Sequence, residues 1–152
     1  MTILSIDPGI EKTGWAIFKN KKYIISSIIV TKKSYYLSKR LLEIYNNLQN
    51  IINQYHPDLI VIENVFFLKN QKTAISIGQA QGIILLLAEK NKIKTNFLTP
   101  LQIKSSLTGY GKADKKSIQK MLKLELNLNI KQDDEADAIA CGWTYILQSQ
   151  NR

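Results

Sequence analysis

The chain has few of the residues that form disulfides or imidazole metal sites, and it has no long apolar run. Its 152 residues include one cysteine, Cys141, and one histidine, His56. A single cysteine forms no internal disulfide, which fits a reducing compartment. A lone histidine beside Pro57 is best explained as a helix-end or surface residue. The longest apolar run, residues 83–88, is far shorter than the ~20 residues of a membrane span, so we expect no membrane segment.

The chain also lacks internal repeats, low-complexity tracts and any stretch with the composition of an interdomain linker. Because 45% of the residues are apolar and occur in regular segments, we expect residues 1–152 to form a single domain with its own core. Asp7 falls where a secretory signal would still be apolar, and no basic stretch precedes it. The expected location is therefore the cytoplasm.

Negative charge is in short supply. The chain has 21 basic and 12 acidic residues, a formal net charge of +9. A merely lysine-rich surface is one explanation, but the lysines cluster: residues 101–131 hold seven of them and only two acids, a net +5. Lysines that neutralise phosphates release counterions and bind in a salt-dependent way. The clustering favours a partner that is a polyanion such as nucleic acid.

The first thirty residues have the pattern of strands. Residues 2–6 are short, apolar and β-branched, and they end at the turn Asp7-Pro8-Gly9. Pro8 favours an extended backbone at Asp7, which should place its carboxylate at the end of a strand. Residues 15–19 and 23–30 predict two more strands, joined by a polar turn. Together these segments indicate an antiparallel meander.

The remaining chain alternates between helix and strand patterns. Residues 37–55 have apolar side chains at helical spacing, and residues 59–62 form a fully apolar run that ends at Glu63. We expect a second helix over about 73–91, a strand over 95–98, short helices from near Pro100 and Lys115, and a last helix over about 134–148. Strands followed by this alternation predict an α/β domain with a mixed sheet.

Four acids stand out against the basic background. Asp7 and Glu63 each end a strand, and parallel neighbouring strands present their carboxyl ends at one edge of a sheet. Asp134 and Asp137 are three residues apart, so they share one side of a helix's first turn. Oxygen ligands of this kind suit Mg²⁺ or Mn²⁺. Packing carboxylates together costs repulsion that a divalent cation relieves.

The helical pair has a simpler explanation as well, since an acid at a helix N-terminus stabilises the helix by ~0.3–1 kcal/mol through the macrodipole. The strand-end acids have less obvious local roles, although an Asp before Pro-Gly is common in turns. Asp133 adjoins Asp134, but only Asp134 keeps the three-residue relation to Asp137. The four acids together favour a metal site that includes Asp134.

Several motifs, taken in order, resemble the RuvC family, the bacterial Holliday junction resolvases of the RNase H-like superfamily. These motifs are Ile6-Asp7-Pro8-Gly9 with Thr13-Gly14, Ile62-Glu63 with Val65-Phe66-Phe67 and Lys69-Asn70, residues 78–82, Thr99-Pro100 through Lys104, residues 108–111, and residues 134–140. Each motif is weak alone, and the combination is specific over nearly the whole chain. The resemblance implies an RNase H-like fold, a mixed five-stranded sheet flanked by helices.

The resemblance also implies an activity: metal-dependent paired nicking of four-way junction DNA in recombination and repair. It makes Asp7, Glu63, Asp134 and Asp137 the catalytic tetrad, which would hold two Mg²⁺ ions with Mn²⁺ as a substitute. It implies a homodimer, which matches the symmetry of a junction, and a branch-migration motor of the RuvA and RuvB type as a partner. The helix near residues 75–88, apolar on more than one face, is explained by such a dimer or by core burial.

The expected DNA contacts follow partly from the resemblance and partly from position. The resemblance assigns Lys104 and Lys115 to phosphate or transition-state contacts and Phe66 to base stacking. Gln81 departs from the family, whose members often have arginine there. Position adds further candidates, each with surface solvation or core packing as the alternative: Phe67, Lys69, Tyr110, Lys112 and Lys116.

Two other functions remain open at this point. One is a junction-binding module without activity, for which the basic charge and Phe66 would suffice. The other is an actin-like or sugar-kinase-like ATPase, because Asp7-Pro8-Gly9 with Thr13-Gly14 also resembles a phosphate loop of that superfamily. The chain is short for the two lobes of such an ATPase.

Overall fold

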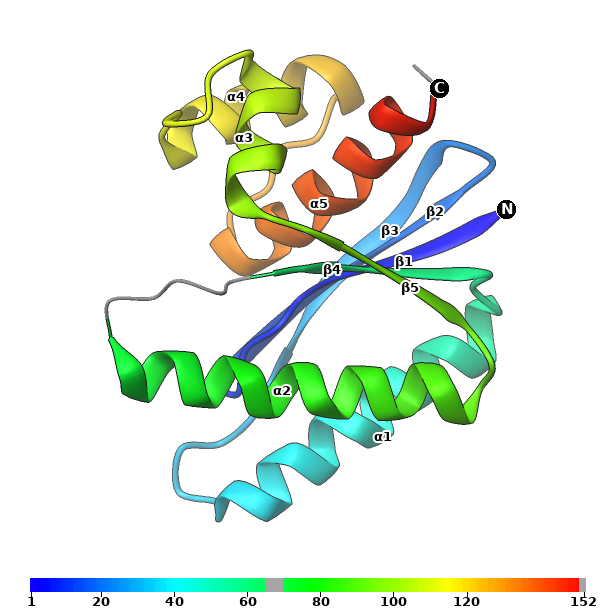
Figure 1. The fold of residues 1–152 in the computed structure, drawn as a ribbon, viewed down its shortest axis with the longest axis vertical. Coiled ribbons are helices and arrows are strands. Elements are labelled where there is room, and N and C mark those ends of the chain that lie inside the picture. Colours follow the sequence, from blue (N-terminus) through cyan, green and yellow to red (C-terminus); the bar gives the residue numbers. More distant parts are fainter. Residues whose placement is uncertain (65–69, 151–152) are drawn as a thin grey trace.

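A mixed five-stranded sheet forms the centre of the protein, in a computed structural model that describes residues 1–64 and 70–150. The strand order is β3-β2-β1-β4-β5 (Figure 1). β1 pairs antiparallel with β2 and parallel with β4, while β2–β3 are antiparallel and β4–β5 parallel. The strands are β1 (Thr2–Asp7), β2 (Lys12–Lys19), β3 (Lys22–Val30), β4 (Leu59–Glu63) and β5 (Lys94–Leu98).

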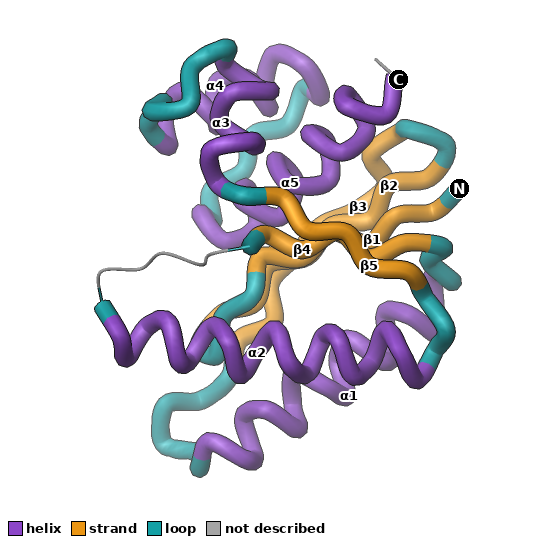
Figure 2. The backbone as a smooth tube through the Cα atoms, in the orientation of Figure 1, coloured by secondary structure: helices purple, strands orange, loops and turns teal. Residues whose placement is uncertain are grey.

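Helices cover both faces of this sheet. One face carries α1 and α2, and the other carries α3, α4 and α5 (Figure 2). The helices are α1 (Leu37–Tyr55), α2 (Gln71–Lys90), α3 (Pro100–Thr108), α4 (Lys115–Leu126) and α5 (Asp133–Gln150). The predicted α/β class with a mixed, five-stranded, RNase H-like sheet is therefore confirmed. None of the helices in the described part of the chain combines the length and apolar character that a membrane span requires.

Alternating side chains of the central strands divide the interior into two cores. Ile3 and Val61 pack with Phe18 under α3–α5, whereas Leu4 and Ile60 pack with α1 and α2 on the other face. A strand covered on both faces favours apolar side chains at every position, which explains the unbroken apolar run of β4. The acids at the ends of β1 and β4 therefore lie where the buried run of each strand stops.

β2 begins three residues before the predicted start at residue 15. Lys12, Thr13 and Gly14 continue the ladder by pairing with residues 28–30 of β3. The sequence has no strand pattern here, because Lys12 and Thr13 are polar and Gly14 has no side chain. Gly14 lies instead where another segment of the backbone approaches closely. A Cβ at this position would collide with the backbone carbonyl oxygen of Asp134.

The contact at Gly14 brings α5 to the edge of the sheet where Asp7 ends β1. Gly14 is the register partner of Asp7 in the β1–β2 ladder. The first turn of α5 therefore rests on β2 beside the end of β1. Further along α5, Gly142 lies so close to Phe18 and Ser5 that a Cβ there would also collide. Two glycines thus determine how closely α5 approaches the sheet.

We predict that Gly14→Ala destabilises the protein by ~2–4 kcal/mol, because the backbone of α5 has to move away from β2. Urea unfolding followed by circular dichroism measures the change. An unchanged unfolding midpoint would show that α5 accommodates the methyl group and does not depend on this contact for its position.

Candidate active site

Asp7 and Glu63 lie side by side at the carboxyl ends of two parallel strands. The register pairs Ile6 of β1 with Ile62 of β4, so the next residue of each strand is an acid. Both acids are partly buried, and their side chains share a hydrogen bond. The predicted meeting of these two strand ends is therefore present in the structure.

Asp134 and Asp137 reach the same place from the first two turns of α5. Asp134 lines a groove of about 740 Å³ together with Asp7. Asp137 lines a smaller hollow of about 170 Å³ together with Glu63, and Lys104 and Lys115 also border that hollow. The four acids thus form a boundary between two depressions, with two acids facing each side.

Burial and mutual repulsion strongly affect the strand-end acids. Burial first, and then the charges of Glu63, Asp137 and Asp134, raise the pKa of Asp7 to about 9. Burial and Asp137 raise the pKa of Glu63 to about 7, while its bond with Asp7 and the charges of Lys115 and Lys104 oppose the increase. Perturbed carboxylates grouped in a cleft are typical of functional sites.

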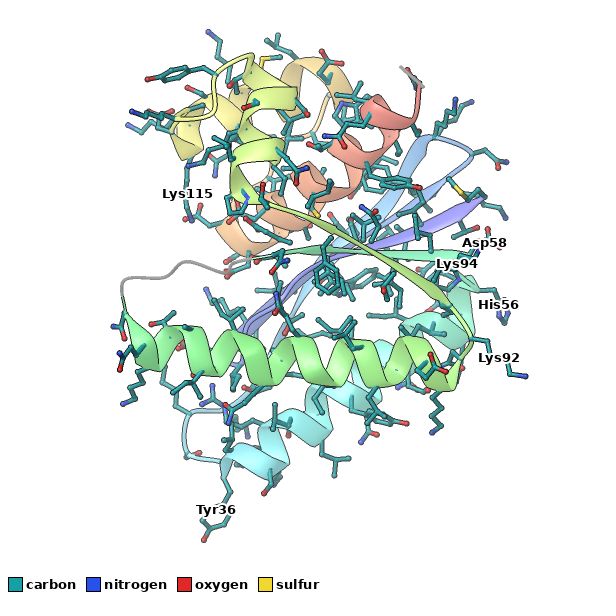
Figure 3. All side chains as sticks on the ribbon, in the orientation of Figure 1. Tyr36, His56, Asp58, Lys92, Lys94 and Lys115 are labelled. Carbon is teal, nitrogen blue, oxygen red and sulfur yellow. The ribbon has the colours of Figure 1, made fainter. Side chains whose placement is uncertain are left out.

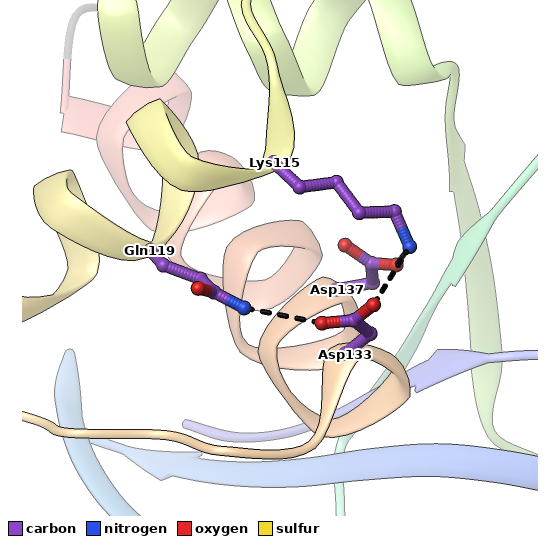
Figure 4. A network of polar contacts seen from close by, with 4 residues as sticks. All are labelled: Lys115, Gln119, Asp133 and Asp137. Carbon is purple, nitrogen blue, oxygen red and sulfur yellow. Dashed lines mark hydrogen bonds and ion pairs between the residues drawn. The ribbon is translucent and has the colours of Figure 1, made fainter.

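Lys115, from the first turn of α4, supplies positive charge to the cluster (Figure 4). Its Nζ lies 3.5 Å from Oδ2 of Asp133 and 3.6 Å from Oδ2 of Asp137. Burial lowers the pKa of Lys115, but the charges of Asp137 and Asp133 raise it, and the pKa is raised as a result. Burial also raises the pKa of Asp137, and the positive charge of Lys115 lowers it in part. Lys115 is therefore a counter-ion to Asp133 and Asp137 beside the acid cluster.

Asp133 and Asp134 are neighbours that face different partners. Oδ1 of Asp133 accepts a hydrogen bond of 3.2 Å from Nε2 of Gln119, so its carboxylate turns toward α4 (Figure 4). Asp134 borders the groove with Asp7 instead. The choice of Asp134 as a metal ligand stays a prediction, and Asp133 contacts Lys115 and Gln119.

The donor set fits a hard cation. Carboxylate oxygens are preferred ligands of Mg²⁺ and Mn²⁺. The raised pKa values of Asp7 and Glu63 come from burial first and then from neighbouring acids, whose repulsion a cation would relieve. Among the described residues, no group of three acidic, histidine or cysteine side chains is already arranged to hold a metal ion. The acid side chains would therefore have to move closer together to coordinate an ion.

Two side chains that the sequence pattern did not predict form hydrogen bonds to the acid cluster or to the residue next to it. Nε2 of Gln81 on α2 donates to the backbone carbonyl of Glu63 at 3.2 Å. Oγ of Ser26 on β3 donates to Oε1 of Glu135 at 2.5 Å, and the hydroxyl of Tyr23 bonds to Ser26 at 2.8 Å. Gln81, in the position where the family often has arginine, here has a structural hydrogen bond.

The predicted DNA contacts fall into three groups. Lys104 and Lys115 border the small hollow beside the acids. Tyr110 and Lys112 are exposed on the loop between α3 and α4, and Lys116 borders a separate hollow on α4 with Lys120 and Lys123. Phe66, Phe67 and Lys69 lie outside the described residues. Lys115 and Lys116 therefore border different hollows, although they are adjacent in the chain.

Strand order, crossing helices and the acids at the ends of β1 and β4 and on α5 together define the RNase H-like class. The family model for crossover junction endodeoxyribonuclease RuvC matches residues 3–145. The chain therefore belongs to the RuvC family.

Individual relatives agree over the full length. RuvC of Caldicellulosiruptor saccharolyticus is 47% identical over 99% of this chain and 95% of its own. RuvC of Thermosipho melanesiensis is 40% identical over 99% of both chains. The solved structure of Thermus thermophilus RuvC in complex with Holliday junction substrate superposes with a TM-score of 0.90 at 23% identity, covering 99% of this chain and 96% of that one. The last comparison supports the fold.

We predict that Asp7→Asn stabilises the metal-free protein at pH 8. The carboxyl has an ordinary pKa of 3.8 when unfolded and about 9 when folded, so its ionisation disfavours the fold progressively as pH rises between those values. Removing the charge should raise the free energy of unfolding by ~1–3 kcal/mol at pH 8 and flatten its decline with pH. Urea unfolding in chelator at pH 5, 6.5 and 8 measures both effects.

The matched control is Glu125→Gln, which neutralises an exposed acid on α4 and should leave the pH profile unchanged. Equal profiles for wild type and Asp7→Asn would contradict the raised pKa of Asp7, which comes from burial and from the neighbouring acids.

Proposed function

We propose that this protein is a Mg²⁺-dependent endonuclease that resolves four-way DNA junctions by paired nicks, in recombination and repair in the cytoplasm. The observation that carries the proposal is the meeting of Asp7, Glu63 and the α5 acids beside two lysines, in a chain of the RuvC family. Acids that hold a cation next to lysines that bind phosphate are the groups that phosphodiester hydrolysis needs.

Members of the RuvC family are metal-dependent nucleases, and the identity and number of ions here belong to the proposal. We assign Asp7, Glu63, Asp134 and Asp137 as the residues that would hold two Mg²⁺ ions, with Mn²⁺ as a substitute. The bound metal would supply Lewis-acid activation of a water nucleophile and charge for the leaving 3′ oxygen. The products would be nicks with 5′ phosphate and 3′ hydroxyl ends, which a ligase can join.

The lysines of the small hollow have a second task. Lys104 and Lys115 border Glu63 and Asp137, so a phosphate beside the acids lies within reach of both ammonium groups. Lys115 contacts two carboxylates across 3.5 and 3.6 Å, and these exposed contacts are weak enough to be exchanged for a phosphate. Its role is to hold the non-bridging oxygens of the DNA while charge develops on them.

Binding of the junction arms falls to the basic surface of residues 101–131. Tyr110, Lys112 and Lys116 are exposed there, and they would contact the sugar-phosphate backbone without reading sequence. We keep Phe66, Phe67 and Lys69 as candidate contacts near the crossover. A branch-migration motor of the RuvA and RuvB type is a further partner that the family resemblance implies.

Cleavage of a synthetic four-way junction should require Mg²⁺ and exceed cleavage of a linear duplex of the same sequence. Asp7→Asn should lower the rate by ~10³-fold or more while junction affinity stays within a few-fold of wild type, because the acid acts on the metal and not on the arms. Denaturing gels with end-labelled strands and a parallel gel-shift measure the two quantities.

Each rival function has its own outcome in this assay. Tight binding without Mg²⁺-dependent nicks in wild type would indicate a binding module. Equal cutting of junction and duplex would indicate a general nuclease, and ATP hydrolysis without DNA would revive the ATPase.

A homodimer is the form in which we expect two nicks to be paired. Ala80, Ile84 and Leu87 of α2 are buried in the core, but Ile75 is 63% and Leu86 59% exposed. Ile75, Gly82 and Leu86 are spaced as one face of the helix, and a Cβ on Gly82 would meet nothing within 4 Å. An apolar face with an open glycine suits the close approach of a second copy.

We predict that Leu86→Glu converts a dimer to a monomer, since the charge would be buried against the partner copy. Light scattering coupled to size exclusion should give half the mass of wild type, with an unchanged circular dichroism spectrum. Leu124→Glu, which changes a 70% exposed leucine on α4, is the matched control and should remain dimeric. A wild type that is monomeric at micromolar concentration would remove the basis for this interface.

A further inference from the structure

The larger depression beside the acids has no role in the function described so far. It is a groove of about 740 Å³ between the β1–β2 turn, the start of α1 and the first turns of α2. Asp7 and Asp134 are among the residues that line it. Its volume lies within the ~300–1,000 Å³ typical of ligand sites. The lysines assigned to phosphate binding border the other depression, on the opposite side of the acids.

Away from the acids, the groove is basic. Lys12, Arg40 and Lys72 line it from three different elements. Glu11 also lines it, but its carboxylate is paired with Nζ of Lys33 at 3.2 Å. Among residues 1–64 and 70–150, no carboxylate lies within ion-pair distance of Arg40. The groove therefore offers uncompensated positive charge next to the acid cluster.

Arg40 is held in place by a buried relay. Its Nε donates to Oγ1 of Thr31 at 2.8 Å, and the Thr31 hydroxyl donates to the backbone carbonyl of Ile10 at 2.5 Å. Thr31 is only 2% exposed. Ile10 belongs to the turn that follows Asp7, so the relay connects the guanidinium to the loop that bears the first acid. An arginine oriented through Nε keeps its two Nη groups for a bidentate acceptor.

We propose that this groove binds the sugar-phosphate backbone of the cleaved strand, on the Asp7 and Asp134 side of the cut, with Arg40 as its phosphate clamp. The inference rests on the proposed nuclease function. A strand whose phosphate lies on the boundary formed by the four acids enters through one depression and leaves through the other. Lys104 and Lys115 serve the small hollow, and Arg40 with Lys72 serves the groove. Arginine at such a site recognises phosphate with two parallel hydrogen bonds.

The test couples a single phosphate to a single side chain. Junctions carry one neutral methylphosphonate at each of the positions flanking the cut in turn, and cleavage is measured at saturating Mg²⁺. In wild type, one flanking position on one side of the cut should reduce the rate ~10-fold, the value of a charge-assisted hydrogen bond. Arg40→Gln should reduce the rate on the unmodified junction by a similar factor and should lose no further activity with that methylphosphonate.

Two more variants separate clamping from folding. Thr31→Val removes the hydroxyl that orients Arg40 while keeping the charge of Arg40. A methylphosphonate at the same position should therefore reduce the cleavage rate of this variant less than it reduces that of wild type. Lys94→Gln removes one charge at the start of β5, at the opposite end of the sheet from the acids, and should leave both rate and coupling unchanged (Figure 3). For Arg40→Gln, the slope of log junction affinity against log salt should be shallower than that of wild type by ~0.7–0.9 for each phosphate contact that is lost.

The outcomes distinguish the two proposals. A wild type that does not cut at all contradicts the proposed function. A wild type that cuts, with additive losses for Arg40→Gln and every methylphosphonate, overturns the groove assignment and leaves the nuclease intact. If Arg40→Gln does not fold, Thr31→Val becomes the deciding variant. A cleavage rate of Thr31→Val that is equally sensitive to a methylphosphonate at every flanking position would also overturn the groove assignment.

Discussion

The burial of carboxylates beside one another at one edge of the sheet is the constraint on which the rest of the structure depends. Burial and neighbouring acids raise the pKa of Asp7 to about 9 and that of Glu63 to about 7, so the metal-free fold holds these groups together against their charge. The strands that end in them are fully buried on both faces, and this packing opposes the repulsion. Local instability at a functional site is commonly tolerated in this way.

The acids also organise the charges around them. The lysines and the arginine near the cluster come from different elements, and they approach it from two sides. Lys115 already contacts Asp137, and Arg40 is oriented by Thr31 without an acidic partner in the described chain. Basic groups therefore lie on each side of a negative centre, and Lys115 compensates part of its charge.

Much of the site follows from the sequence because two strand patterns end in acids. The apolar runs before Asp7 and Glu63 predict parallel neighbours, and the structure has them. The sequence does not reveal which face of α5 meets the sheet, since Asp133 and Asp134 differ by one residue. It also does not reveal the groove, because Arg40 and Thr31 join through a side-chain bond between a helix and the residue after a strand. Gln81 shows a departure from the family pattern but not its partner, the carbonyl of Glu63.

The hydrogen bond between Ser26 and Glu135 restricts how α5 can turn about its own axis. Successive residues of a helix differ by about 100° around its axis, so a roll of α5 by one residue would exchange Asp133 for Asp134 beside Asp7. Glu135 lies on the far side of that turn and is tied to β3, an outer strand of the sheet. The Ser26 hydroxyl therefore opposes such a roll, and it helps to keep Asp134, rather than Asp133, in the groove beside Asp7.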